Sequence, residues 1–163
     1  MGNVVIRPIL PADNPHIARV IRSVLEDFNV PKTGTAYADV SLNSMYETYQ
    51  SPRAAYYVLE CGGKIVGGAG VASLEGYDGN VCELQKMYFL PEIRGRGWGA
   101  QTIDICLQKA RRLGFVQCYL ETMSYMQAAQ RLYQKYGFQY LEGPMGDTGH
   151  HACGVHMILK LYP

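Results

Sequence analysis

The sequence predicts a single domain of mixed α/β class (α+β in the order of its elements), and three observations support this. Residues 55–90 hold three strand-like segments separated by short turns, as in an antiparallel meander. Two amphipathic helical patterns then alternate with strands over residues 99–141. A length of 163 residues suits one hydrophobic core, so we expect residues 1–163 to form one domain.

The first half of the chain is expected to begin with a strand and two helices. Asn14 before Pro15 is a helix-start signal, because it places a capping side chain beside a proline at the first helical position. The glycine pair after Cys61 indicates a tight turn between two strands. In chain order we expect a strand at 4–6, a helix from about 13 to 28, a loop at 30–39, a weaker helix at 40–50, and strands at 55–60 and 65–73.

The second half is expected to alternate strands with helices. Pro91 ends a long strand, and a glycine-rich loop separates that strand from an amphipathic helix that Gly114 terminates. Gly137 stops a second helix in the same way. The expected elements are strands at 81–90, 115–122, 138–141 and 150–161, and helices at about 99–113 and 126–136.

Composition excludes several classes of protein. A net charge of +1 is too balanced for a protein that binds nucleic-acid backbones or an anionic membrane surface. Apolar runs stay well short of the ~20 residues of a membrane span, and the N-terminus lacks the pattern of a signal peptide. The five cysteines are odd in number and form no CxxC pair, which indicates reduced thiols. We therefore expect a cytoplasmic protein.

The strongest local motif is the run from Arg94 to Ala100, which reads Arg-Gly-Arg-Gly-Trp-Gly-Ala. Glycines let consecutive N–H groups point inward at a helix N-terminus, where they can hold a pyrophosphate, and Arg94 and Arg96 add charged donors. A degenerate dinucleotide fingerprint, with Glu121 as its acidic residue, also fits the run, but the loop lies mid-chain after a meander. A plain glycine-rich turn is the remaining alternative.

Two motifs together resemble the GNAT superfamily of acyl-CoA-dependent N-acetyltransferases. Arg94, Gly97 and Gly99 match that family's loop, Arg/Gln-x-x-Gly-x-Gly/Ala. A second signature, Leu-Tyr-x-x-x-Gly-Phe at a helix end, is matched by residues 132–138. The segment 83–91 and the tail with Gly149, His150 and Cys153 look like an uncharacterised bacterial branch of the family.

The resemblance implies a fold and a cofactor site. The fold is a mixed, mostly antiparallel sheet of seven strands with about four helices, splayed between two central strands, here 81–90 and 115–122. Acetyl-CoA is the implied donor, with its pantetheine arm in the splayed gap. The implied cofactor-binding residues are Met87, Tyr88 and Phe89 at the strand end, and Arg94, Gly95, Arg96, Gly97, Trp98, Gly99 and Ala100 in the loop.

One position departs from the family pattern. Many relatives carry asparagine seven residues before the helix tyrosine, where its side chain helps to hold the pantetheine arm or the strand end. Met126 stands there in this chain, and a thioether cannot replace the donors of an amide.

Glu83 and Tyr133 are the candidate catalytic residues. Acetyl transfer requires an amine that has lost its proton, a polarised thioester carbonyl and a proton for the departing thiolate. Glu83 lies in the strand before the loop, where some family members carry a base, and the backbone N–H groups near Met87 and Tyr88 are candidate donors to the carbonyl oxygen. Tyr133 is the candidate acid; the alternatives are a structural carboxylate and a core tyrosine.

The sequence gives weaker signals for the residues that bind the acceptor amine. Tyr37, Asp39, Tyr46 and Tyr49 lie in the segment that lines the acceptor site in relatives, and Asp39 and Glu47 could attract a cationic amine, although we interpret Glu47 as solvated charge.

The histidine-rich tail is a second candidate region for the acceptor site. Its spacing, His150, His151, Cys153 and His156, is not a zinc pattern, so no metal is expected. In a strand, His150 and His156 would share one face and His151 and Cys153 the other.

The predicted function is transfer of an acetyl group from acetyl-CoA to a primary amine of a small molecule, by direct transfer in a ternary complex. Acetylation of protein lysines or N-termini, and a non-catalytic acyl-CoA-binding regulatory module, are the alternatives. No nucleic-acid or membrane partner is expected, and relatives suggest a possible homodimer.

Overall fold

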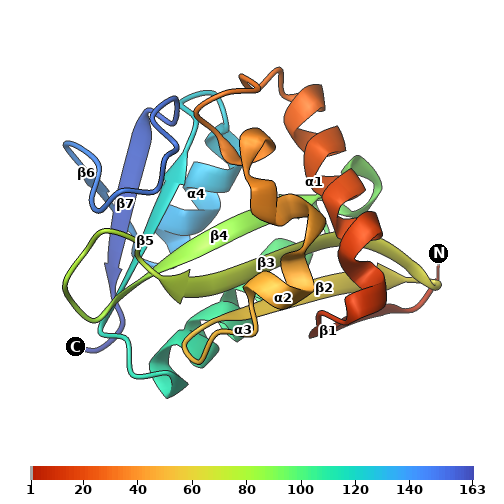
Figure 1. The fold of residues 1–163 in the computed structure, drawn as a ribbon, viewed down its shortest axis with the longest axis horizontal. Helices are drawn as coiled ribbons and strands as arrows, with labels where there is room; N and C mark the ends of the chain where they lie inside the picture. Colours follow the sequence, from red (N-terminus) through yellow and green to blue (C-terminus); the bar gives the residue numbers. More distant parts are fainter. Residues whose placement is uncertain (1) are drawn as a thin grey trace.

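The computed structural model describes residues 2–163, and the seven strands of this part of the chain form one sheet (Figure 1). Their order across the sheet is β1-β2-β3-β4-β5-β7-β6. The strands are β1 (Val4–Pro8), β2 (Ala55–Cys61), β3 (Lys64–Ser73), β4 (Val81–Phe89), β5 (Gln117–Thr122), β6 (Gln139–Leu141) and β7 (Val155–Lys160). Within residues 2–163 only β4 and β5 pair in parallel. The mixed, mostly antiparallel seven-stranded sheet is therefore confirmed.

Helices cover both faces of the sheet. The α-helices are α1 (Asn14–Asp27), α2 (Met45–Thr48), α3 (Trp98–Arg112) and α4 (Gln127–Lys135). The described residues also form short 3-10 helices: η1 (Pro11–Asp13) between β1 and α1, η2 (Ala36–Ala38) and η3 (Val40–Asn43) between α1 and α2, and η4 (Pro91–Ile93) between β4 and α3. One apolar core lies between the sheet and α3, and a second lies between the sheet and α1 with α2. In Figure 1, α1 and α2 lie in front of the sheet and α3 behind it.

The two central strands pair only at their beginnings. Val81–Glu83 of β4 lie opposite Gln117–Tyr119 of β5, and beyond Glu83 the two strands share no ladder hydrogen bonds. β5 instead continues along β7 to Thr122, and β4 continues along β3 to Phe89. The expected splay between strands 81–90 and 115–122 is thus present, and the gap lies at the carboxyl ends of both strands.

A bulge interrupts β4 at the point where the strands part. Gly68 pairs with Tyr88 and Gly70 with Gln85, so Lys86 and Met87 together oppose one residue of β3. Lys86 has a positive φ of 49°, which is uncommon for a residue with a side chain. The hydroxyl of Tyr56 donates to the Lys86 carbonyl at 2.7 Å and holds this conformation.

The predicted strand over residues 150–161 was wrong at its start. β7 begins at Val155, and residues 150–154 form a turn in which the Cys153 N–H donates to the His150 carbonyl. Gly149, with a φ of +76°, and Gly154 flank this turn, so the apolar alternation of a strand starts only after them. The expected alternation of faces for His150, His151 and Cys153 therefore does not apply.

The predicted helix over residues 40–50 is broken into two pieces. η3 ends at Asn43 and α2 begins at Met45, because Ser44 has an extended φ of −140° that a continuous helix cannot contain. The other predicted elements are present, with ends that differ by one to a few residues. None of the helices within residues 2–163 combines the length and apolar composition needed to cross a membrane.

Candidate active site

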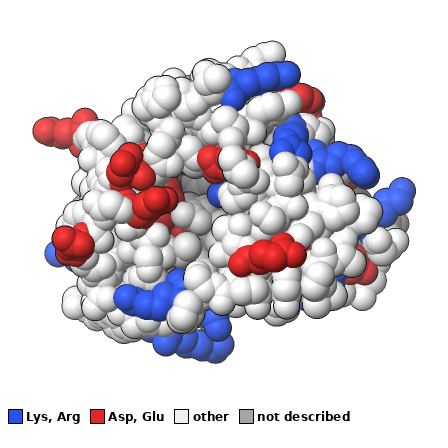
Figure 2. All heavy atoms as spheres, viewed as in Figure 1, with Lys and Arg blue, Asp and Glu red and all other residues white. Residues whose placement is uncertain are grey.

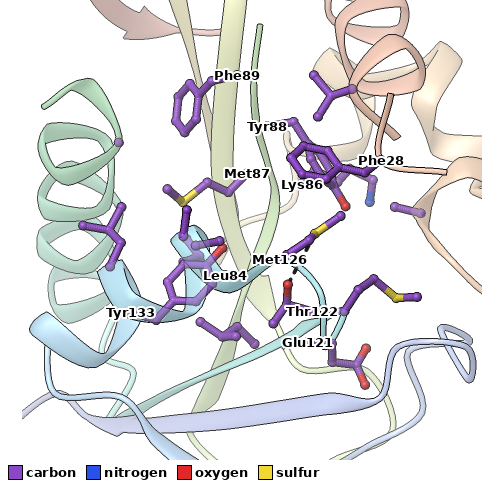
Figure 3. Close-up of a pocket in the computed structure, with 18 of the residues that line it drawn as sticks. Phe28, Leu84, Lys86, Met87, Tyr88, Phe89, Glu121, Thr122, Met126 and Tyr133 are labelled. Carbon is purple, nitrogen blue, oxygen red and sulfur yellow. Dashed lines mark hydrogen bonds between the residues drawn. The ribbon is translucent and has the colours of Figure 1, made fainter. Parts of the chain in front are cut away.

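The gap between β4 and β5 opens into a pocket of about 870 Å³. Its walls come from α1 and the loop after it, from β4 and the glycine-rich loop, from β5 and the loop after it, and from α4. Figure 3 shows Tyr133 on one side of this pocket, Lys86, Tyr88 and Phe28 on the other, and Glu121 at its base. The glycine-rich loop and the charged residues Glu83 and Lys86 of β4 therefore line a single cavity.

The glycine-rich loop forms the N-terminus of α3. Gly95 and Gly97 have φ values of +69° and +83°, and a Cβ atom built on either would meet no other atom within 4 Å. Glycine is needed at these positions for the backbone conformation, and the space in front of them is open. Arg94, Gly95, Gly97, Gly99 and Ala100 line the pocket. N–H groups at a helix N-terminus beside open space are suited to bind an anion.

The two arginines and the tryptophan of the loop are placed differently from one another. Arg94 donates through Nε to the Phe89 carbonyl at 2.8 Å, and its guanidinium lies 5.1 Å from the centre of the Phe28 ring. Trp98 packs against Leu59, Val66 and Ile93 on the flank of the sheet, which favours packing over covering a ligand. Arg96 is exposed.

The end of β4 presents its backbone to the gap. Met87, Tyr88 and Phe89 all line the pocket. Beyond Glu83 this edge of β4 has lost its pairing with β5, so its N–H and C=O groups face the gap. A ligand lying along the gap can therefore take the hydrogen bonds that a neighbouring strand would have made.

Tyr133 lies on α4 and reaches toward Leu84 and Met87 of β4 (Figure 3). Its ring packs edge-on against Phe138. Among residues 2–163 its hydroxyl has no hydrogen-bond partner, and that hydroxyl opens on the pocket. Burial raises the pKa of the Tyr133 phenol, so it remains a proton donor at neutral pH.

Glu83 is the last residue of β4 that pairs with β5, and it is buried, with 6% of its surface exposed. Gln85 donates to its Oε1 at 2.7 Å, and Tyr49 in turn donates to the Gln85 side chain at 2.6 Å. Burial raises the pKa of Glu83 to about 7; the Gln85 hydrogen bond opposes this rise and the Glu121 carboxylate adds to it. A carboxyl group with such a pKa can take or give a proton near neutral pH.

A chain of charged groups surrounds Glu83. Asp39 accepts hydrogen bonds from His150 Nε2 at 2.9 and 3.0 Å and pairs with Lys86 Nζ at 3.1 Å. His150 Nδ1 lies 3.8 Å from Glu121, whose side chain is only 4% exposed. Thr148 and Tyr119 donate to the two oxygens of Glu121. Figure 2 shows acidic side chains gathered around a hollow near the centre of this face.

Charge pairing sets the protonation of this chain. Burial favours the neutral forms of both Asp39 and His150, but their mutual hydrogen bond and the charge of Lys86 keep the pKa of Asp39 below its usual value. The hydrogen bond to Asp39 and its negative charge likewise overcome burial and raise the pKa of His150. Asp39 is therefore held ionised by the Lys86 ammonium and the hydrogen bond from His150.

Comparison with known proteins identifies the family. The model of the acetyltransferase (GNAT) family matches residues 20–138. This chain belongs to the GNAT family. It is 42% identical over 158 residues to an uncharacterised N-acetyltransferase of Escherichia coli, YjgM, covering 96% of this chain and 95% of that one.

Solved GNAT structures share the fold. An acetyltransferase of the GNAT family from Staphylococcus aureus Mu50 has a TM-score of 0.87 at 18% identity, covering 98% of this chain and all of that one. A putative acetyltransferase from Salmonella typhimurium, yncA, solved with its cofactor acetyl-CoA, has a TM-score of 0.77 at 23% identity, over 99% of this chain and 96% of that one. The chain is thus an N-acetyltransferase with the GNAT fold.

At Met126, where this chain departs from the GNAT pattern, a different amide side chain lies nearby. Met126 lines the pocket and accepts from Thr122 Oγ1 at 3.6 Å through its sulfur. The loop after β5 is tied instead by Gln130, whose Nε2 donates to the Met123 and Ser124 carbonyls at 2.9 and 3.1 Å. The end of β5 therefore has an amide anchor one helical turn later than the family pattern places it.

Of the tail histidines, His150 and His156 both approach the carboxylate of Glu121, at 3.8 and 3.9 Å, whereas His151 lies elsewhere. His151 packs over Gly34, and His156 stacks on Tyr119. The described residues do contain one mixed donor group, Glu83, Glu121 and His150, with ligand atoms within 4.8 Å of one another. Such a group can hold a divalent cation, but each member already has a protein partner, in Gln85, Thr148 and Asp39 respectively.

Two residues of the site escaped the sequence analysis. Glu121 was considered only as part of a dinucleotide fingerprint, although it is a charged residue in an otherwise buried strand, which is a usable signal. Lys86 gave no signal, because regular alternation along β4 would place its side chain away from Gln85, and only the bulge brings both to the same face. The predicted acceptor-side residues between α1 and β2 all lie outside the pocket lining: Tyr37, Asp39, Tyr46, Glu47 and Tyr49. Asp39 still contacts the lining residues Lys86 and His150, and Tyr49 contacts the lining residue Gln85. Tyr37 instead donates to Glu26.

Proposed function

We propose that this GNAT enzyme transfers the acetyl group of acetyl-CoA directly to a primary amine of a small molecule. One observation carries the proposal: a single pocket contains an open helix N-terminus, a strand edge unpaired beyond Glu83, a tyrosine hydroxyl with no partner among residues 2–163, and a buried glutamate with a pKa near 7. These are the groups needed to hold a coenzyme A thioester and to move the protons of amide formation.

The donor would lie along β4. Its pyrophosphate would bind the N–H groups of residues 94–100, and its pantetheine arm would hydrogen-bond the free edge at Met87, Tyr88 and Phe89. The open space in front of Gly95 and Gly97 and the volume of the pocket fit such a ligand. The structure of yncA with acetyl-CoA supports the same assignment by fold likeness.

The reaction would need three proton transfers. Glu83 would take a proton from the acceptor ammonium, and the amine nitrogen would attack the thioester carbonyl carbon. Backbone N–H groups near Met87 and Tyr88 would stabilise the negative charge on the carbonyl oxygen. As the carbon–sulfur bond breaks, Tyr133 would give its proton to the departing thiolate, and the second proton lost by the nitrogen as the amide forms would restore the phenol of Tyr133.

Cysteine chemistry does not favour a covalent enzyme intermediate. Cys153 lines the pocket, but burial raises the pKa of its thiol to about 12, so it is not a thiolate at neutral pH. This supports direct transfer within a complex of enzyme, donor and acceptor.

The shape of the acceptor side favours a small acceptor. The turn at 150–153 lies against the loop after α1, where the Ala152 N–H donates to the Gly34 carbonyl at 2.9 Å. Together these segments cover the charged end of the pocket, so an extended protein chain would have to displace them.

A panel of amines with acetyl-CoA tests the proposal. We expect thiol release that depends on a small primary amine and forms the N-acetyl product by mass spectrometry. Release only with lysine-containing peptides would indicate a protein acetyltransferase. Tight acetyl-CoA binding without acceptor-dependent release would indicate a regulatory binding module.

A further inference from the structure

The acceptor end of the pocket carries charges of both signs close together. Glu83 and Glu121 provide carboxylates, and beside them the Lys86 ammonium pairs with Asp39, which is also hydrogen-bonded to His150. Atoms of His150, Glu83 and Glu121 lie within 4.8 Å of one another, and Asp39 links His150 to Lys86, so the Lys86 cation and the two carboxylates belong to one connected group. A ligand that matches this arrangement has an ammonium and an anion on neighbouring atoms.

The ammonium of Lys86 has capacity for another partner. Its side chain is only 8% exposed, and Asp39 Oδ2, at 3.1 Å, is its ion-pair partner within the described residues. An ammonium has three N–H donors, so one carboxylate oxygen leaves donors for a ligand. A buried cation is costly to desolvate unless such donors are used, which favours an anionic group of the ligand beside it.

The bulge in β4 determines the face of the sheet on which the Lys86 side chain lies. Leu84 and Met87 both pack in the core beneath α3, whereas Gln85 contacts Tyr49 and Lys86 contacts Asp39 on the opposite face. Without the extra residue, regular alternation would turn the lysine into the apolar core. The positive φ of Lys86 and the Tyr56 hydrogen bond thus hold a cation in the acceptor site.

An apolar wall stands beside the charged groups. It is formed by the end of α1 and by residues that follow β5, and includes Val24, Leu25, Phe28, Met123 and Met126. Figure 3 shows Phe28 beside Tyr88 and Lys86. An acceptor with an apolar side chain would bury that side chain here.

We propose that the acceptor is a free α-amino acid with an apolar side chain, whose carboxylate binds Lys86 and whose amine faces Glu83. This inference rests on the proposed acetyltransferase function and specifies its acceptor. Lys86 is then a specificity residue: it binds the group that distinguishes an amino acid from a simple amine or from a peptide N-terminus, both of which lack the neighbouring carboxylate.

Matched acceptors test the inference. Thiol release is measured with L-leucine, L-leucinamide and 3-methylbutan-1-amine, and with L-phenylalanine, L-phenylalaninamide and 2-phenylethylamine. We expect kcat/KM for the amino acids to exceed that for the amide and the amine by at least about tenfold, the worth of one charged hydrogen bond. Equal or faster turnover of the amines or amides would overturn the inference and leave the acetyltransferase proposal standing. Absence of release with every amine in a wider panel would overturn both.

Variants at Lys86 separate recognition from folding. In Lys86→Met we expect a rise of at least about tenfold in KM for the amino acids, and a much smaller change for the matched amines. Lys86→Arg should restore part of the preference, because it keeps the charge. Lys64→Met, at the exposed first position of β3, is the matched control. A loss of activity shared equally by amino acids and amines would show that Lys86 is structural, and would overturn its assignment.

Discussion

At the scale of single residues, the site depends on two ionisable groups whose pKa values lie far apart. Burial raises the pKa of Glu83 to about 7, so this carboxyl group titrates near neutrality, whereas burial of the Tyr133 phenol keeps it protonated. The base on β4 and the acid on α4 lie on opposite sides of the gap, so one can act on the acceptor amine and the other on the departing thiolate.

The pH dependence of turnover tests Glu83. A base works in its ionised form, so kcat/KM should rise about tenfold per pH unit below the pKa near 7 and level off above it. Glu83→Gln should lower kcat/KM by about 10²- to 10⁴-fold and remove this limb of the pH profile. Glu92→Gln, at an exposed position, is the control. Persistence of the limb in Glu83→Gln would assign it to another group.

Tyr133→Phe tests the acid. The change removes one hydroxyl that has no partner within residues 2–163, so the fold should be little affected. We expect kcat to fall at least about tenfold while the Kd of acetyl-CoA, measured by calorimetry, changes little. Unchanged turnover would leave Tyr133 as a core residue, and a large change in Kd would make it a binding residue.

At the scale of elements, the bulge in β4 links the fold to the chemistry. Tyr56→Phe removes the hydroxyl that donates to the Lys86 carbonyl, and should lower the free energy of unfolding by about 1–3 kcal/mol, as for a buried acceptor left without its donor. Urea denaturation measures this loss. Tyr57→Phe, at the next position on the other face of β2, should change stability by less, and kcat/KM should fall only in Tyr56→Phe.

Sequence patterns predicted regular elements better than the irregular ones that build the acceptor site. The meander, the glycine-rich loop and both long helices follow from apolar periodicity and from glycines at their ends, as at Gly114 and Gly137. The bulge at Lys86 and the turn at 150–154 left no periodic signal, because a single extra residue or a short turn shifts the faces of the residues around it. Glu83 and Tyr133 were found through family motifs, and their roles stay predictions.

At the scale of the whole molecule, the splayed sheet divides the site between two halves. One half contains β1 to β4 with α1 and α3, and the other contains β5 to β7 with α4. Within the sheet of residues 2–163 the two halves are joined by the short pairing at Val81–Glu83, and outside the sheet by contacts such as those of His150 with Asp39 and of Ala152 with Gly34. A ligand in the gap contacts both halves at once, because β4, α3, β5 and α4 all line the pocket. Donor binding should therefore stabilise the entire fold rather than one part of it.

Thermal unfolding with acetyl-CoA tests this link. At a concentration 100 times the Kd, a ligand that binds only the folded state adds about 2.7 kcal/mol, which for a protein of this size raises Tm by about 5–10 °C. Gly97→Ala should lose most of this rise, because φ at Gly97 is +83° and a methyl group there would enter the space in front of α3. Gly63→Ala is a matched control, since Gly63 has a φ of +82° and equally open surroundings in the β2–β3 turn. Both variants should lose about 1–2 kcal/mol of stability from backbone strain, but only Gly63→Ala should keep the full response to acetyl-CoA. Equal responses in the two variants would contradict a pyrophosphate site at this loop.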